Sequence, residues 1–198
     1  MQALVVQSHS YLTVLYVAIA VWAVPEWIGS YLQRSKRRGM VRRDRGSHLF
    51  LVVCLMVGMF LAFVCVQAVP AATMTWQQPL LFWAGIALIL AGVTFRWYVI
   101  RILGRFFTRD VATHEDHHVV QSGPYRLIRH PSYTGVLVTV LGLGLALTNW
   151  LSLLIVLGCT VLGISYRVWV EERALCESLG DAYRDYMRRT KRFIPYLW

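Results

Sequence analysis

The sequence predicts an all-α integral membrane protein with five transmembrane helices, of which the last two form a helical hairpin. Three observations lead to this fold class. Hydrophobic residues make up 57% of the 198 residues and the mean hydropathy is +0.51, which is high for a soluble globule. Eight Trp and ten Tyr suit the aromatic belts of membrane interfaces. Five apolar runs alternate with loops that are either rich in Lys and Arg or free of them.

The apolar runs give the five expected spans, at residues 11–24, 49–66, 80–95, 136–147 and 151–164. A spanning helix needs ~20 mostly apolar residues, so every run except 49–66 is expected to include flanking residues. Only Thr148, Asn149 and Trp150 separate the last two runs. These runs are therefore expected to form a hairpin with its tip at Asn149.

The distribution of positive charge predicts the orientation. Residues 34–45 contain seven Lys and Arg, residues 96–129 contain six, and the remaining seven begin at Arg167, whereas segments 70–79 and 148–150 contain none. Five crossings place all twenty on one side, which the positive-inside rule makes cytoplasmic. We therefore expect a multi-pass protein with its N-terminus outside. We treat 1–198 as one membrane domain, with the first two spans in 1–70 and a core in 79–198.

Several classes of partner are not expected. The net charge of +10 is confined to segments between apolar runs, without a soluble reading domain, so no nucleic-acid partner is predicted. The four cysteines form no CxxC pair, which argues against disulfides and zinc sites. The His, Glu and Asp residues of 114–118 lack the HExxH spacing, so we interpret them as a solvated loop and predict no metal.

Residues 123–135, GPYRLIRHPSYTG, form a polar tract directly before the fourth apolar run. Polar residues at a membrane boundary are costly and indicate a functional site. Pro131 suits the first turn of a helix, and the free amides of that turn, with Arg126 or Arg129, could hold an anion such as a carboxylate. The alternative is that the arginines anchor the interface and the proline only begins the helix.

A second candidate site lies where the fifth span ends. Arg167 and Glu171 are four residues apart, so they share one helix face, whereas Glu172 faces elsewhere. One interpretation is an arginine that orients an anionic substrate and is held by a carboxylate. The other is an ordinary surface ion pair. Further along, apolar residues between 175 and 187 recur at helical spacing, which predicts an amphipathic helix with a weak point or joint at Gly180.

These pieces occur in an order that resembles a known family. GPYR at 123–126, RHPSYTG at 129–135, Arg167 with Glu171-Glu172, GDAY at 180–183 and RFIP at 192–195 resemble the isoprenylcysteine carboxyl methyltransferase family and its wider phospholipid-methyltransferase-like relatives. The resemblance covers the second half of the chain. It implies an integral membrane methyltransferase that uses S-adenosyl-L-methionine, enclosed on the cytoplasmic side by the loop before the fourth span and a C-terminal helix.

The resemblance also implies roles for single residues. Arg167 and Glu171 would form the catalytic pair on the substrate side. The cofactor pocket would contain Gly123, Tyr125, Arg129, His130, Pro131, Tyr133 and Glu172.

The identity of the acceptor is left open between alternatives. Carboxyl O-methylation of an isoprenylcysteine-like substrate and N-methylation of a phospholipid or other hydrophobic amine both require a lipid-linked or hydrophobic substrate and contact with membrane lipids. A nicotinamide-dependent membrane reductase has a related C-terminal architecture, but the chain has no Gly-rich phosphate loop. A non-enzymatic scaffold is a further class. The glycines of the last two spans either allow close helix packing or leave a groove for a lipid chain, and the oligomeric state is not predicted.

Overall fold

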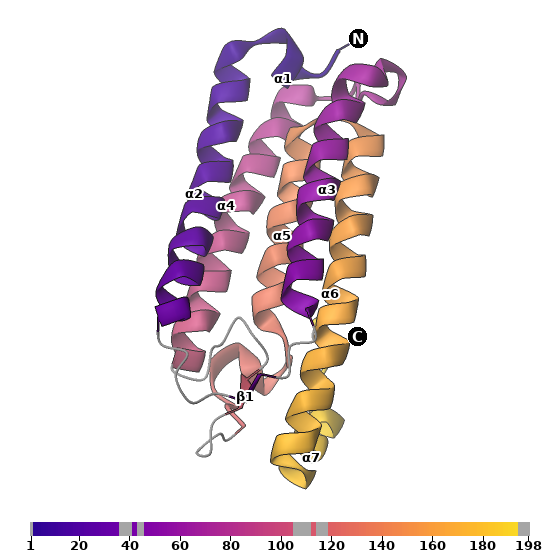
Figure 1. Ribbon diagram of the computed structural model, residues 1–198. Helices are drawn as coiled ribbons and strands as arrows, with labels where there is room; N and C mark the ends of the chain where they lie inside the picture. The colour runs from indigo at the N-terminus through magenta and orange to yellow at the C-terminus, as the bar shows by residue number, and fades with distance from the viewer. Residues whose placement is uncertain (1, 36–40, 43–45, 105–111, 114–118, 194–198) are drawn as a thin grey trace.

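Five long helices, arranged up and down, dominate the computed structural model of the chain, which describes residues 2–35, 41–42, 46–104, 112–113 and 119–193 (Figure 1). They are α2 (His9–Ser35), α3 (Ser47–Ala68), α4 (Gln78–Leu103), α5 (Pro131–Ala146) and α6 (Trp150–Leu179). The shorter elements are α1 (Leu4–Gln7), η1 (Pro70–Ala72), η3 (Gly123–Arg126) and α7 (Asp181–Arg189), with strands β1 (Val41–Arg42) and β2 (Ala112–Thr113). The all-α prediction is confirmed, apart from this two-residue antiparallel pair.

Four of the long helices are long and apolar enough to cross a membrane, and α5 is shorter. At 1.5 Å per residue, the 16 residues of α5 extend about 24 Å and the 30 residues of α6 about 45 Å. Pro131 begins α5, and the turn at 147–149 ends it. Because α6 starts at that same turn, its last turns extend beyond the beginning of α5, and the predicted site residues lie there.

A seam of glycines joins α4 to α5. A Cβ atom on Gly85 would lie 2.5 Å from the Gly142 carbonyl oxygen, and one on Gly92 would lie 2.7 Å from that of Gly135. Gly85 and Gly92 are seven residues apart on α4, and Gly135 and Gly142 are seven residues apart on α5. The same face of each helix therefore makes both contacts. Such small residues let helices approach closely within a membrane.

The other long pairing joins α3 to α6. A Cβ atom on Gly163 of α6 would lie 3.2 Å from the Leu51 Cα atom, and one on Gly58 of α3 would lie 2.8 Å from the Cys159 Cβ atom. Within the hairpin, Gly144 approaches Leu153 in the same way. Four of the five glycines of the last two predicted spans, Gly135, Gly142, Gly144 and Gly163, are therefore packing positions. The fifth, Gly158, has no neighbouring atom within 4 Å.

Polar contacts close the hairpin end of the molecule. Asn149 is fully buried, accepts a hydrogen bond from the Ser152 amide as the N-cap of α6, and donates one to the Val69 carbonyl. The Met74 amide donates to the Thr148 carbonyl at 2.8 Å. The predicted turn around Asn149 is confirmed, and these contacts join it to the segment after α3.

The opposite end carries the charged helix α7 and the beginning of α5 (Figure 1). There β1 pairs with β2, which connects the segments after α2 and after α4. Gly180 separates α6 from α7 with φ +58°, a conformation that glycine adopts at little cost. The predicted amphipathic helix is thus two helices, with the predicted joint between them.

Candidate functional site

Glu172 is the centre of a buried ionic network at the charged end. Its Oε1 atom accepts a hydrogen bond from Arg129 Nε at 3.0 Å and lies 3.3 Å from His130 Nε2. Arg192 Nη2 donates to Glu172 Oε2 at 2.9 Å. Glu172 is 5% exposed and His130 is 4% exposed, whereas the Arg192 side chain is 41% exposed. One buried carboxylate therefore holds two arginines and a histidine from two separate segments, 129–130 and the segment after α7.

The segment after α7 pairs with the tract that precedes α5. The Arg129 amide donates to the Lys191 carbonyl at 2.7 Å, and the His130 amide donates to the Arg192 carbonyl at 3.0 Å. The Lys191 amide donates in turn to the Leu127 carbonyl. These backbone bonds place Arg192 beside Glu172.

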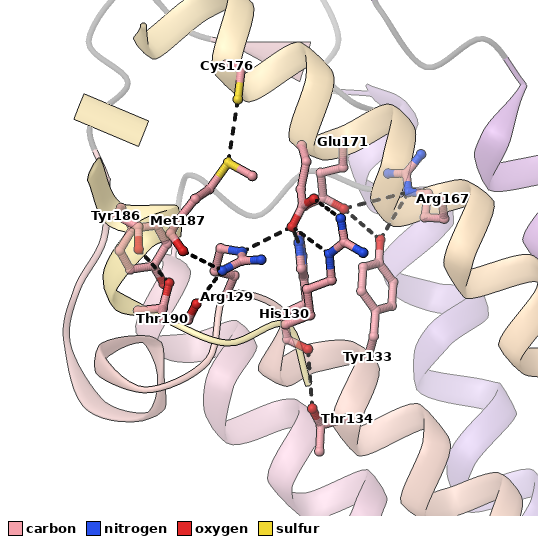
Figure 2. A network of polar contacts seen from close by, with 12 residues as sticks. Arg129, His130, Tyr133, Thr134, Arg167, Glu171, Cys176, Tyr186, Met187 and Thr190 are labelled. Carbon is pink, nitrogen blue, oxygen red and sulfur yellow. Dashed lines mark hydrogen bonds and ion pairs between the residues drawn. The ribbon is translucent and has the colours of Figure 1, made fainter. Parts of the chain in front are cut away.

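Side chains reinforce this pairing (Figure 2). Arg129 Nη1 donates to the carbonyls of Met187, at 2.9 Å, and Thr190. The Thr134 hydroxyl donates to the Phe193 carbonyl at 2.8 Å. Arg129 thus joins α6, α7 and the loop before α5.

Arg167 lies in a second polar cluster beside the first. Arg167 Nε donates to the Tyr133 hydroxyl at 3.0 Å, and that hydroxyl donates to Glu171 Oε2 at 2.9 Å. The direct distance from Arg167 Nε to Glu171 Oε2 is 4.0 Å. Arg167 Nη1 donates to Ser47 Oγ at 2.7 Å. Because Arg167 is 2% exposed, the alternative of an ordinary surface ion pair is wrong.

Tyrosine hydroxyls hold η3 against α4 and α7. The buried Tyr125 hydroxyl donates to the Val99 carbonyl at 3.4 Å, and the Tyr186 hydroxyl donates to the Tyr125 carbonyl at 2.6 Å. Burial raises the pKa of Tyr186 to about 12. Burial, followed by the negative charge of Glu171, also raises the pKa of Tyr125. Both hydroxyls therefore remain protonated donors at neutral pH.

A partly buried ion pair supports the first turn of α5 from α2 and α4. Arg96 contacts both carboxylate oxygens of Glu26, at 2.6 and 3.3 Å. Arg96 Nη1 also donates to the Ser132 carbonyl at 3.1 Å. The residue before Tyr133 is thereby tied to two further helices.

The structure brings most of the predicted site residues together. Arg129, His130, Tyr133, Glu171, Glu172 and Arg167 form the two adjacent clusters. Figure 2 labels all of them except Glu172 in one view. Pro131 is the first residue of α5, as predicted, and Tyr125 and Gly123 lie in η3.

The structure corrects the expectation that the first-turn amides of α5 are free to hold an anion. Two amides expected to face a ligand, those of Tyr133 and Thr134, donate instead to the His130 carbonyl. Among the residues that the structure describes, Arg126, the alternative anion-binding arginine, forms no ion pair. The polar residues of 114–118 lie outside the described residues.

Sequence reasoning did not include Arg192, Ser47 and Glu26 in the site. Arg192 belongs to the RFIP element at 192–195, which is part of the family resemblance. That element could have indicated that Arg192 belongs to the site. Ser47 and Glu26 lie in the first two long helices, where no comparable pattern occurs.

Part of the chain matches a known family. Residues 85–177 match the isoprenylcysteine carboxyl methyltransferase (ICMT) family. The matched segment contains most of α4, all of α5 and nearly all of α6. The predicted resemblance to the ICMT family is confirmed, whereas α2, α3 and α7 lie outside the match.

The chain is also similar to curated proteins and to a solved structure. The chain is 28% identical over 117 residues to a probable protein-S-isoprenylcysteine O-methyltransferase of Oryza sativa subsp. indica, covering 58% of this chain and 61% of that protein. It is 33% identical over 96 residues to the protein-S-isoprenylcysteine O-methyltransferase of Schizosaccharomyces pombe, covering 48% and 41%. The structure of a eukaryotic intramembrane Ras methyltransferase, ICMT, matches with a TM-score of 0.55 and 24% identity, covering 74% of this chain and 52% of that chain.

These comparisons support an integral membrane protein with the ICMT fold. The chain spans about 60% or less of the length of these curated relatives. The solved structure is similar to this chain in fold. The segment that matches the family, 85–177, contains every predicted site residue of the chain.

Proposed function

We propose that this protein is an S-adenosylmethionine-dependent methyltransferase that acts on a membrane-embedded or lipid-linked acceptor. The carrying observation is the buried Arg167 guanidinium, held by Tyr133 and Glu171 next to the Glu172 network. We further propose that residues 79–198 form the core of the enzyme, within a single membrane domain.

The described residues fit the chemical groups of S-adenosylmethionine. The carboxylates of Glu171 and Glu172 suit its ammonium group and ribose hydroxyls, and Arg129 or Arg192 suits its carboxylate. The rings of Phe193 and Tyr133 lie 6.2 and 5.8 Å from that of His130 and suit its adenine ring. Gly123, Tyr125 and Pro131 would shape the same pocket. When bound, the cofactor supplies a methyl group already activated on a sulfonium centre.

Arg167 favours an acceptor that is negatively charged. A buried guanidinium attracts a carboxylate and can bind it through two parallel hydrogen bonds, whereas it repels a protonated amine. We therefore propose carboxyl O-methylation of an isoprenylcysteine-like substrate rather than N-methylation of a phospholipid amine.

The transfer requires little acid–base chemistry from the chain. Because the bound cofactor would supply an activated methyl group, a carboxylate acceptor would need no proton removed before it reacts. Arg167 holds and orients the carboxylate, Tyr133 and Glu171 hold Arg167, and the buried position excludes water. Positioning of this kind can supply several kcal/mol of the barrier reduction.

We also propose that the site faces the cytoplasm. All twenty Lys and Arg lie in segments that an up-and-down arrangement of the five long helices places at one end. The positive-inside rule assigns that end to the cytoplasm and the N-terminus to the outside.

Arg167→Ala tests the proposal. Purified wild type should transfer labelled methyl groups from S-adenosylmethionine to a prenylcysteine analogue. Losing the charge that positions the acceptor should lower the rate by about 10²-fold or more. Calorimetry should show nearly unchanged affinity for the cofactor. Arg167→Lys should restore little activity, because an ammonium group lacks the bidentate geometry of a guanidinium.

Arg173→Ala is the matched control, because Arg173 lies on the same helix with a 55% exposed side chain. It should leave turnover within about twofold of the wild type, in keeping with a surface ion pair. Equal turnover of Arg167→Ala and wild type would contradict the role of Arg167. Transfer to lipid amines in place of prenylcysteine analogues would contradict the proposed acceptor, and binding of nicotinamide nucleotides alone would indicate a reductase.

A further inference from the structure

The feature that carries a further inference is the contact between Ser47 and Arg167. Ser47 is the first residue of α3, is fully buried, and its Oγ accepts a 2.7 Å hydrogen bond from Arg167 Nη1. α3 lies outside the segment that matches the ICMT family. The contact therefore joins the N-terminal half of the chain directly to the proposed catalytic arginine.

Helix packing sets this contact. One turn before Arg167, Gly163 of α6 lies against Leu51, which is one turn after Ser47 on α3. The two helices run in opposite directions, so moving four residues from the Gly163–Leu51 contact on both helices leads to the Ser47–Arg167 pair. Because a Cβ atom on Gly163 would lie 3.2 Å from the Leu51 Cα atom, the separation of the helices is closely constrained at this level.

The guanidinium is held from two directions. Tyr133 of α5 accepts from Nε, and Ser47 of α3 accepts from Nη1, which lies elsewhere on the planar group. A tether on one side of a planar group restrains its plane less than tethers on two sides. A second tether from another helix fixes the orientation of the plane, and the orientation decides whether a carboxylate can bind through two parallel bonds.

We propose that Ser47 is a positioning residue that fixes the plane of the Arg167 guanidinium for the acceptor. This inference rests on the proposed function, because it assigns Ser47 a part in orienting the methyl acceptor. It extends the site to a helix to which neither the sequence pattern nor the family match assigns a role.

Three variants separate positioning from packing. Ser47→Ala removes the acceptor oxygen, and Ser47→Thr keeps it. Ser152→Ala is the matched control, because Ser152 Oγ donates a buried 2.7 Å hydrogen bond to the Ala62 carbonyl between the same two helices, at their opposite end. Ser47→Ala should lower kcat by about ten- to a hundredfold with an unchanged Kd for S-adenosylmethionine. Ser47→Thr should restore most of kcat, and Ser152→Ala should leave kcat near that of the wild type.

A second measurement does not depend on activity. Phenylglyoxal modifies arginine guanidinium groups, and peptide mass spectrometry gives the rate at each position. In wild type, Arg167 should react far more slowly than Arg173, whose side chain is 55% exposed. Ser47→Ala should raise the Arg167 rate severalfold relative to Arg173, whereas Ser47→Thr and Ser152→Ala should not.

The outcomes separate the two proposals. If wild type transfers no methyl groups, the proposed function fails, and the phenylglyoxal rates still decide whether Ser47 holds Arg167. If wild type is active but Ser47→Ala matches Ser152→Ala in kcat, the positioning role of Ser47 is overturned. An unchanged Arg167 rate in Ser47→Ala also overturns it.

Discussion

Glu172→Gln should destabilise the protein more than any other neutralisation of a single acidic residue on α6. The carboxylate and the Arg129 side chain are 7% and 9% exposed, so water compensates little for the lost charge. Breaking a buried ion pair by removing one partner costs about 3–5 kcal/mol. The remaining amide oxygen can still accept one hydrogen bond, which offsets about 1 kcal/mol. Arg192 adds little, because its side chain is 41% exposed.

The expected net loss is therefore about 2–4 kcal/mol. For a chain of this length, 1 kcal/mol corresponds to about 2–4 °C, so the midpoint of thermal unfolding should fall by roughly 4–16 °C. The assay is thermal unfolding of purified protein in one detergent, with helicity at low temperature confirming that the variant is folded.

Glu177→Gln is the control on the same helix. Glu177 pairs with Arg173, and their side chains are 49% and 55% exposed, so its loss should cost about 0.3–0.5 kcal/mol. If Glu172→Gln unfolds within 2 °C of Glu177→Gln, the buried network contributes no more than a surface pair. Our interpretation of Glu172 as the centre of the site would then be refuted.

Two further predictions concern packing and orientation. Gly142→Ala should destabilise the protein by about 1–3 kcal/mol, because its Cβ would lie 2.5 Å from the Gly85 carbonyl oxygen, whereas Gly158→Ala, with open space, should be neutral or stabilising in the same unfolding assay. A membrane-impermeant thiol reagent applied to intact cells should label a cysteine at the exposed Thr75 position and not one at Lys191, in a background without the native cysteines. Labelling at Lys191 alone would reverse the proposed orientation.

Sequence patterns located the elements well, because local rules decide them. Apart from Leu147, the apolar runs lie within the five long helices. Pro131 and Gly180 mark the boundaries that their backbone chemistry predicts. Side chains of adjacent helical residues point about 100° apart, which predicted that Glu171 and Glu172 would contact different partners. Those two assignments needed no knowledge of the tertiary structure.

Contacts between distant helices were harder to predict, because they depend on how the helices align. Ser47 and Glu26 lie in ordinary sequence surroundings, and only the packing of α3 and α2 brings them to Arg167 and Arg96. The α4–α5 seam did leave a signal, since its glycines repeat at an interval of seven residues on both helices. A search for matching intervals would have paired these helices correctly.

The late position of Arg192 in the chain has a consequence for biosynthesis. Its partner Glu172 is 20 residues earlier, and Arg129, which the segment after α7 also holds, is 43 residues before Glu172. A ribosome makes all five long helices before it adds the segment that pairs with Arg129 and His130. The growing chain can therefore enter the membrane and pack its helices while the ionic network is still incomplete. We therefore expect membrane insertion to begin before the site is assembled.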